Sequence, residues 1–215
     1  MQVLNILIKK EFAIDFRKKS AIGGVLLFVF SSVLVLKLCF TKPDPLVWLS
    51  LYWLIALFAA FNTVLKSFTN EKNARQLYYY QIISPLQSHF SKLIYCFLNL
   101  LVINLLTFGV MALLLLQPMR VLSVFFLALC IGAMSFAIIL SFVSAVAAKA
   151  DNPNLLISVL GFPVVIPVLI LLVKLSKNGL MLVDTAWFWE IFNIVGIDAI
   201  LIALTIILIP FLWKE

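Results

Sequence analysis

The feature that most constrains the fold of this chain is an uncharged run of 19 residues, from Leu155 to Val173. A helix of about 20 apolar residues crosses the roughly 30 Å hydrocarbon core of a bilayer. Gly161, Pro163 and Pro167 lie in the middle of this run. A proline removes a backbone donor and bends a helix, which a membrane helix tolerates when its neighbours satisfy the freed carbonyls. The run therefore predicts a membrane-spanning helix that bends at mid-depth.

The composition extends this prediction to the whole chain. Its 215 residues are 65% hydrophobic and 12% charged, whereas a soluble domain is about half apolar and a quarter charged. The long apolar runs lack the alternation of an outer-membrane barrel, so we expect an all-α membrane protein with a single transmembrane domain, residues 1–215. Six spans are predicted, over about Ala21–Phe40, Leu46–Leu65, Leu93–Leu116, Val121–Ala148, Leu155–Val173 and Ile191–Trp213.

The basic residues set the expected orientation. An even number of spans puts both termini on one side, and that side holds eleven of the sixteen Lys and Arg residues: Lys9, Lys10, Arg17, Lys18, Lys19, Lys66, Lys72, Arg75, Lys92, Lys149 and Lys214. The other side holds five: Lys37, Lys42, Arg120, Lys174 and Lys177. The positive-inside rule then predicts that both termini are cytoplasmic. This topology accounts for the net charge of +7, so no nucleic-acid partner is expected.

Catalytic, metal-binding and stable cofactor sites are not predicted. The chain has one histidine, His89, which is too few for a multi-histidine metal site. It has no G-x-x-x-x-G-K-[ST] sequence to cradle nucleotide phosphates, so any ATP-driven work requires a partner subunit. The three cysteines match no metal, redox or haem-attachment spacing, and we interpret them as small buried apolar residues.

Two segments outside the spans are expected to lie on the cytoplasmic side. In residues 1–20, apolar side chains recur every four residues among five basic ones, which predicts an interfacial helix. Residues 66–92 form the longest stretch between spans on this side. There Ser84-Pro85 is typical of a helix start, and a run of three tyrosines begins at Tyr78, close to Arg75. Tyrosines of this kind suit a membrane interface and a protein-docking element equally well, and the composition favours neither.

Asp198 is the only carboxylate inside a predicted span. An acid within the bilayer is costly and indicates a functional site. If the last helix begins near Val195 instead, Asp198 lies at the membrane interface and needs no such role. The sequence leaves these two interpretations level.

Four passages together resemble the CcmB family, the permease subunit of the haem-exporter ABC complex of cytochrome c maturation. They are LIKKEFAIDFRKKS, FTNEKNARQLYYYQIISPLQSHFSK, SFAIILSFVSAVAAKADNPNLL and, most specifically, LLISVLGFPVVIPVLI. The last is similar to the family's span in which two prolines follow a pair of leucines. The resemblance extends over nearly the whole chain.

The resemblance implies a type-2 ABC exporter-like permease in the bacterial inner membrane. Its partners would be an ABC ATP-binding subunit, which uses the ATP, and a haem-handling membrane protein that loads a periplasmic chaperone. The 66–92 loop would be the coupling element, with candidate residues Glu71, Arg75, Tyr78, Tyr79, Ser84 and Pro85. Gly161, Pro163 and Pro167 become a candidate hinge.

The resemblance leaves the mechanism open. Either the subunit moves haem as its substrate, or it transmits ATP-driven motion that releases loaded chaperone. Alternatives outside the family are a type-2 permease for a lipid, glycan or drug, and a membrane scaffold without transport.

Overall fold

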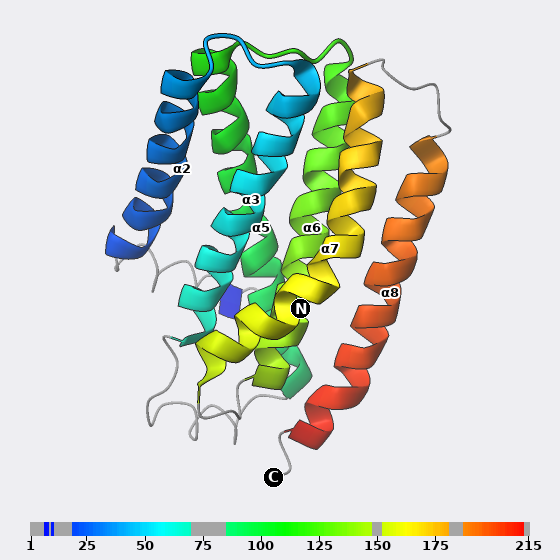
Figure 1. Cartoon of the computed structure of the whole chain (residues 1–215). Coiled ribbons are helices and arrows are strands. Elements are labelled where there is room, and N and C mark those ends of the chain that lie inside the picture. Colours follow the sequence, from blue (N-terminus) through cyan, green and yellow to red (C-terminus); the bar gives the residue numbers. More distant parts are fainter. Residues whose placement is uncertain are drawn as a thin grey trace.

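All regular structure is helical in the part of the chain that the computed structural model describes. That part comprises residues 7–8, 10, 19–69, 85–147, 152–180 and 187–212. It contains six long helices: α2 (Lys19–Cys39), α3 (Pro45–Thr69), α5 (Pro85–Leu115), α6 (Leu122–Ala147), α7 (Pro153–Gly179) and α8 (Trp187–Leu212). Each coincides with one predicted span, which confirms the all-α fold (Figure 1).

Proline marks the start of three helices. Pro45, Pro85 and Pro153 are the first residues of α3, α5 and α7. Proline suits this position because the first amide of a helix has no intrahelical acceptor and the ring fixes a helical φ. At the start of α3, the carbonyl of Asp44 accepts the first intrahelical bond from the amide of Trp48 at 2.8 Å. The start of α5 at Pro85 is the one that the Ser84-Pro85 pattern predicts.

Five of the six helices are long and apolar enough to cross a bilayer: α3, α5, α6, α7 and α8. In α2 the apolar part is shorter, Gly23–Cys39, so the count of six spans stays a prediction there. Helix α5 begins eight residues before the predicted span, and α7 continues to Gly179 instead of ending at Val173. The predicted limits were set at Lys92 and Lys174. Lys174 is exposed, and a long lysine side chain can extend towards water while the helix continues. Lys92 instead lies buried within α5.

Helix α6 lies at the centre of the bundle. It contacts α3, α5, α7 and α8, whereas α2 packs mainly on α3 and α5. Figure 1 shows α2 and α8 at opposite edges. Two small residues of α6, Ala137 and Ser141, are fully buried, as expected where helices approach closely.

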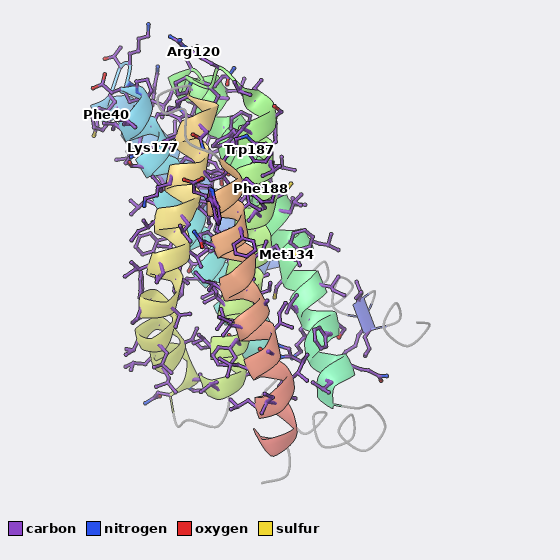
Figure 2. The ribbon with its side chains drawn as sticks, turned by 90° about the vertical axis from the view of Figure 1, so that its right-hand side faces the viewer. Phe40, Arg120, Met134, Lys177, Trp187 and Phe188 are labelled. Carbon is purple, nitrogen blue, oxygen red and sulfur yellow. The ribbon has the colours of Figure 1, made fainter. Side chains whose placement is uncertain are left out.

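The bundle has two ends, which we name by their connections. The loop end is where α3 ends at Thr69 and α5 begins at Pro85, and α8 also ends there (Figure 1). At the opposite end, the amides of Arg120 and Val121 donate to the carbonyl of Gly179 at 3.1 and 3.0 Å. These bonds tie the start of α6 to the end of α7. Figure 2 shows Arg120, Lys177 and Trp187 towards this opposite end.

Trp53 joins three helices in the half of the bundle away from the loop end. Its indole Nε1 donates to Ser176 Oγ at 3.0 Å, which links α3 to α7. Its ring lies against Gly132 of α6, where an added Cβ would come within 2.6 Å of Trp53 Cη2. Tyr52 packs beside it, with ring centroids 5.3 Å apart, and Phe125 packs on Tyr52, with centroids 5.1 Å apart. Only glycine at position 132 permits this approach, so the three helices are fixed against one another here.

The interpretation of all three cysteines as buried is wrong for two of them. Cys96 is buried, but Cys39 and Cys130 are exposed. Both exposed thiols lie in apolar helices, α2 and α6. On a helix surface that faces lipid, a small apolar side chain needs no cover from protein.

Candidate functional site

Most of the candidate coupling residues lie outside the described part of the chain: Glu71, Arg75, Tyr78, Tyr79 and Ser84. The structure places the two ends between which they run. The connection leaves α3 after Thr69 and enters α5 at Pro85, so it is shorter than the predicted 66–92 loop. The role of these residues stays a prediction.

The three candidate hinge residues lie within one continuous helix. Helix α7 passes through both Pro163 and Pro167, and Figure 1 shows that its axis changes direction along its length. Both prolines are exposed, whereas Gly161 is buried. Each proline lacks the amide that would donate four residues back, so the carbonyls of Val159 and Pro163 lose their usual partners. The bend is observed, and movement at this bend stays a prediction.

Gly161 lets helix α3 approach the proline segment closely. A Cβ added at Gly161 would lie 2.8 Å from Phe61 Cε1, so only glycine permits this contact. The Phe61 ring stacks on Phe162, with centroids 4.7 Å apart and an interplanar angle of 18°. Phe58 packs edge-on against the Phe162 ring, with ring centroids 6.2 Å apart. Two rings of α3 therefore hold α7 at the residues next to its first internal proline.

This contact lies near the loop end on both helices. Phe61 precedes Thr69 by eight residues, and Gly161 follows Pro153 by eight. At 1.5 Å per residue, each separation is about 12 Å. About two turns of helix and one pair of stacked rings therefore separate the end of α3 from α7.

The contact at Gly161 makes a testable prediction about stability. We expect Gly161→Ala to lower the free energy of unfolding by about 1–3 kcal/mol, because the new methyl group overpacks against Phe61. Gly196→Ala in α8 is the matched control, since nothing lies within 4 Å of a Cβ there. Thermal unfolding of the purified protein in detergent gives the comparison. Equal midpoints of thermal unfolding for Gly161→Ala and Gly196→Ala would contradict the close contact between Gly161 and Phe61.

Asp198 lies inside α8, so the helix start on which the interfacial interpretation depended is not observed. The helix begins at Trp187, eleven residues earlier, and not near Val195. The Asp198 side chain is 8% exposed, and Ser135 Oγ of α6 donates to its Oδ2 at 2.6 Å. Sequence reasoning identified the acid but not its partner, since nothing in the chain indicates which residue of α6 faces α8.

His89 is part of α5 and not of an exposed loop. Its side chain is 7% exposed and its ring packs edge-on against Phe90 at 6.4 Å. Among the residues that the structure describes, no group of three or more His, Cys, Asp or Glu side chains comes together. The described part of the site is a bent helix held by aromatic rings.

Several long apolar helices and a proline-bent helix packed beside the loop end define a multi-pass membrane protein. The family model described as CcmB protein matches residues 1–213, and the chain belongs to the CcmB family. This confirms the resemblance that the sequence passages indicated. The family is that of the haem-exporter permease subunit in c-type cytochrome biogenesis, a transporter component and not a catalytic enzyme. No curated protein matches the chain.

Proposed function

We propose that this chain couples ATP hydrolysis by a separate ABC ATP-binding subunit to haem delivery across the bacterial cytoplasmic membrane. The ATP-binding subunit docks on the loop between α3 and α5, and a haem-handling membrane protein is the neighbour on which the motion acts. Membership of the CcmB family, matched over residues 1–213, supports an ABC ATP-binding subunit as the class of partner. The main support for the proposed route of coupling, from the loop through α3 to α7, is the contact of Phe61 with Gly161 and Phe162.

The orientation of the chain supports this docking side. The loop between α3 and α5 contains Lys72 and Arg75, and it lies on the side that holds eleven of the sixteen basic residues. By the positive-inside rule the loop end faces the cytoplasm, where ATP is hydrolysed. The five basic residues of the other side include Arg120 and Lys177, which Figure 2 shows towards the opposite end.

The anchoring of α7 supports motion about its prolines. Away from the loop end, Ser176 accepts the hydrogen bond from Trp53, and Gly179 accepts two bonds from the start of α6. Near the loop end, Gly161 and Phe162 contact Phe61 of α3 and would move with it. The two prolines lie between these attachments. Pushing the end of α3 would therefore change the angle between the two halves of α7 while the far half stays fixed.

In this mechanism the chain transmits motion, and the haem is handled by its neighbour. A change in the bend of α7 alters the membrane surface that the haem-handling protein contacts, and loaded chaperone is released from that protein. Haem is the cargo of the complex and no residue of this chain is assigned as its axial ligand. An export substrate of another kind, such as a lipid, glycan or drug, is the outcome that would replace this proposal.

Association with the ATP-binding subunit is the direct test of the coupling proposal. The chain is co-expressed with the ATP-binding subunit of the same complex, extracted in mild detergent and purified through a tag on the permease. We expect the two proteins to elute together in a fixed ratio. An unrelated ABC ATP-binding subunit, expressed to the same level, is the control and should be lost on washing. If the ATP-binding subunit of the same complex is lost on washing to the same extent as the unrelated one, the proposed partner is wrong.

A further inference from the structure

A buried acid lies near mid-depth of the membrane domain. Asp198 follows the start of α8 by eleven residues, about 16 Å along the helix, and precedes its end at Leu212 by about 21 Å. Its partner Ser135 lies thirteen residues, about 20 Å, into α6. The pair is therefore far from both ends of its helices, and α8 is long and apolar enough to cross a bilayer.

One oxygen of this carboxyl group is satisfied and the other is not. Oδ2 accepts a hydrogen bond from Ser135 Oγ at 2.6 Å, and Ser135 is fully buried. Oδ1 is also buried and makes no hydrogen bond with any described residue. A carboxylate that carries its full charge in this position would cost several kcal/mol, unless a cation or further donors compensate it.

No cation among the described residues contacts the acid. Helices α5, α6 and α7 pack against α8. The titratable side chains described on these four helices, apart from Asp198 itself, are His89, Lys92, Tyr95, Cys96, Cys130, Lys174, Lys177 and Glu190. None of them forms a hydrogen bond or ion pair with Asp198, whose sole side-chain bond within the described residues is that with Ser135. Lys92 lies near the start of α5, and the other two lysines lie near the end of α7.

We propose that Asp198 and Ser135 form a proton-binding site inside the membrane domain. The carboxyl group takes one proton from water onto Oδ1, while Oδ2 serves as the carbonyl oxygen that accepts the bond from Ser135. The neutral form removes the buried charge and keeps the link between α6 and α8. A proton fits this site better than a metal ion, because the site has one anionic group and no cluster of further ligands among the described residues.

Infrared spectroscopy of the purified full chain in lipid vesicles tests this site. A protonated carboxyl group has a C=O stretching band that a carboxylate lacks. We expect this band in the wild type at neutral pH and its loss in Asp198→Asn. In Ser135→Ala the band should move to higher wavenumber, since a carbonyl that accepts no hydrogen bond is stiffer. Glu190→Gln, in the first turn of the same helix, should leave the band unchanged.

Two results would overturn the proposal. One is an identical carboxyl region for the wild type and Asp198→Asn across a pH series around neutrality, which would mean that the acid holds no proton. The other is an unshifted band in Ser135→Ala, which would mean that Oδ2 is not the bonded carbonyl. The second variant retains Asp198 and removes one hydroxyl group, so it decides the question even if Asp198→Asn folds poorly.

Discussion

Replacing Pro163 and Pro167 together with alanine is expected to reduce mature c-type cytochromes by roughly tenfold or more. Both prolines lie on the exposed side of a continuous helix. Alanine restores two backbone donors, and in helix interiors it is favoured over proline by about 3 kcal/mol per residue. Because every 1.4 kcal/mol changes an equilibrium tenfold, the double variant should hold α7 straight. Haem staining of c-type cytochromes in a complemented deletion strain measures the loss.

The control for this prediction is a third proline of the same helix. Pro153 is the first residue of α7, where an alanine restores no intrahelical hydrogen bond and leaves the bend of the helix unchanged. Pro153→Ala should therefore support normal haem staining. Immunoblots of membrane fractions should show equal amounts of the wild type, the double variant and Pro153→Ala, since a straightened helix still inserts. If the double variant supports normal cytochrome maturation at equal protein levels, the two prolines have a packing role only.

Replacing Arg75 and Tyr79 together with alanine is expected to weaken association with the ATP-binding subunit by roughly thirtyfold. Arginine and tyrosine are enriched at interface hot spots, whose truncation costs about 2 kcal/mol or more. Both residues belong to the loop between α3 and α5. Co-purification through a tag on the permease, followed by quantification of the bound subunit, measures the change.

A pair of the same residue classes at the opposite end of the bundle is the matched control. Arg120 and Trp187 are both exposed, and Figure 2 shows them far from the loop end. Arg120→Ala with Trp187→Ala should leave the yield of the ATP-binding subunit unchanged. If the loop variant also gives the wild-type yield, the docking role of this loop is wrong and its tyrosines serve only the membrane interface.

The sequence predicts the helices because the bilayer imposes simple requirements. A run such as Leu155 to Val173 has few alternatives to a spanning helix, and proline marks where helices start. The predicted limits failed where they relied on charge. Helix α5 includes Lys92, whose side chain is buried. Helix α7 continues past Lys174, whose exposed side chain can reach water from within a helix.

The contacts of the candidate site could not be predicted in the same way. The approach of Phe61 to Gly161 joins residues one hundred positions apart, and it depends on the rotation of two helices about their axes. The pairing of Asp198 with Ser135 depends on the same kind of register between α6 and α8. Hydrophobic patterns carry little of this information when most faces of a helix are apolar.

Haem staining of c-type cytochromes after deletion of the gene tests the central claim most directly. If the chain is the permease of the haem-delivery complex, the deletion strain should lack covalently bound haem in its c-type cytochromes, and the wild-type chain should restore it. Unaltered c-type cytochromes in the deletion strain would contradict the assigned role. That result would favour an exporter of another substrate or a membrane scaffold.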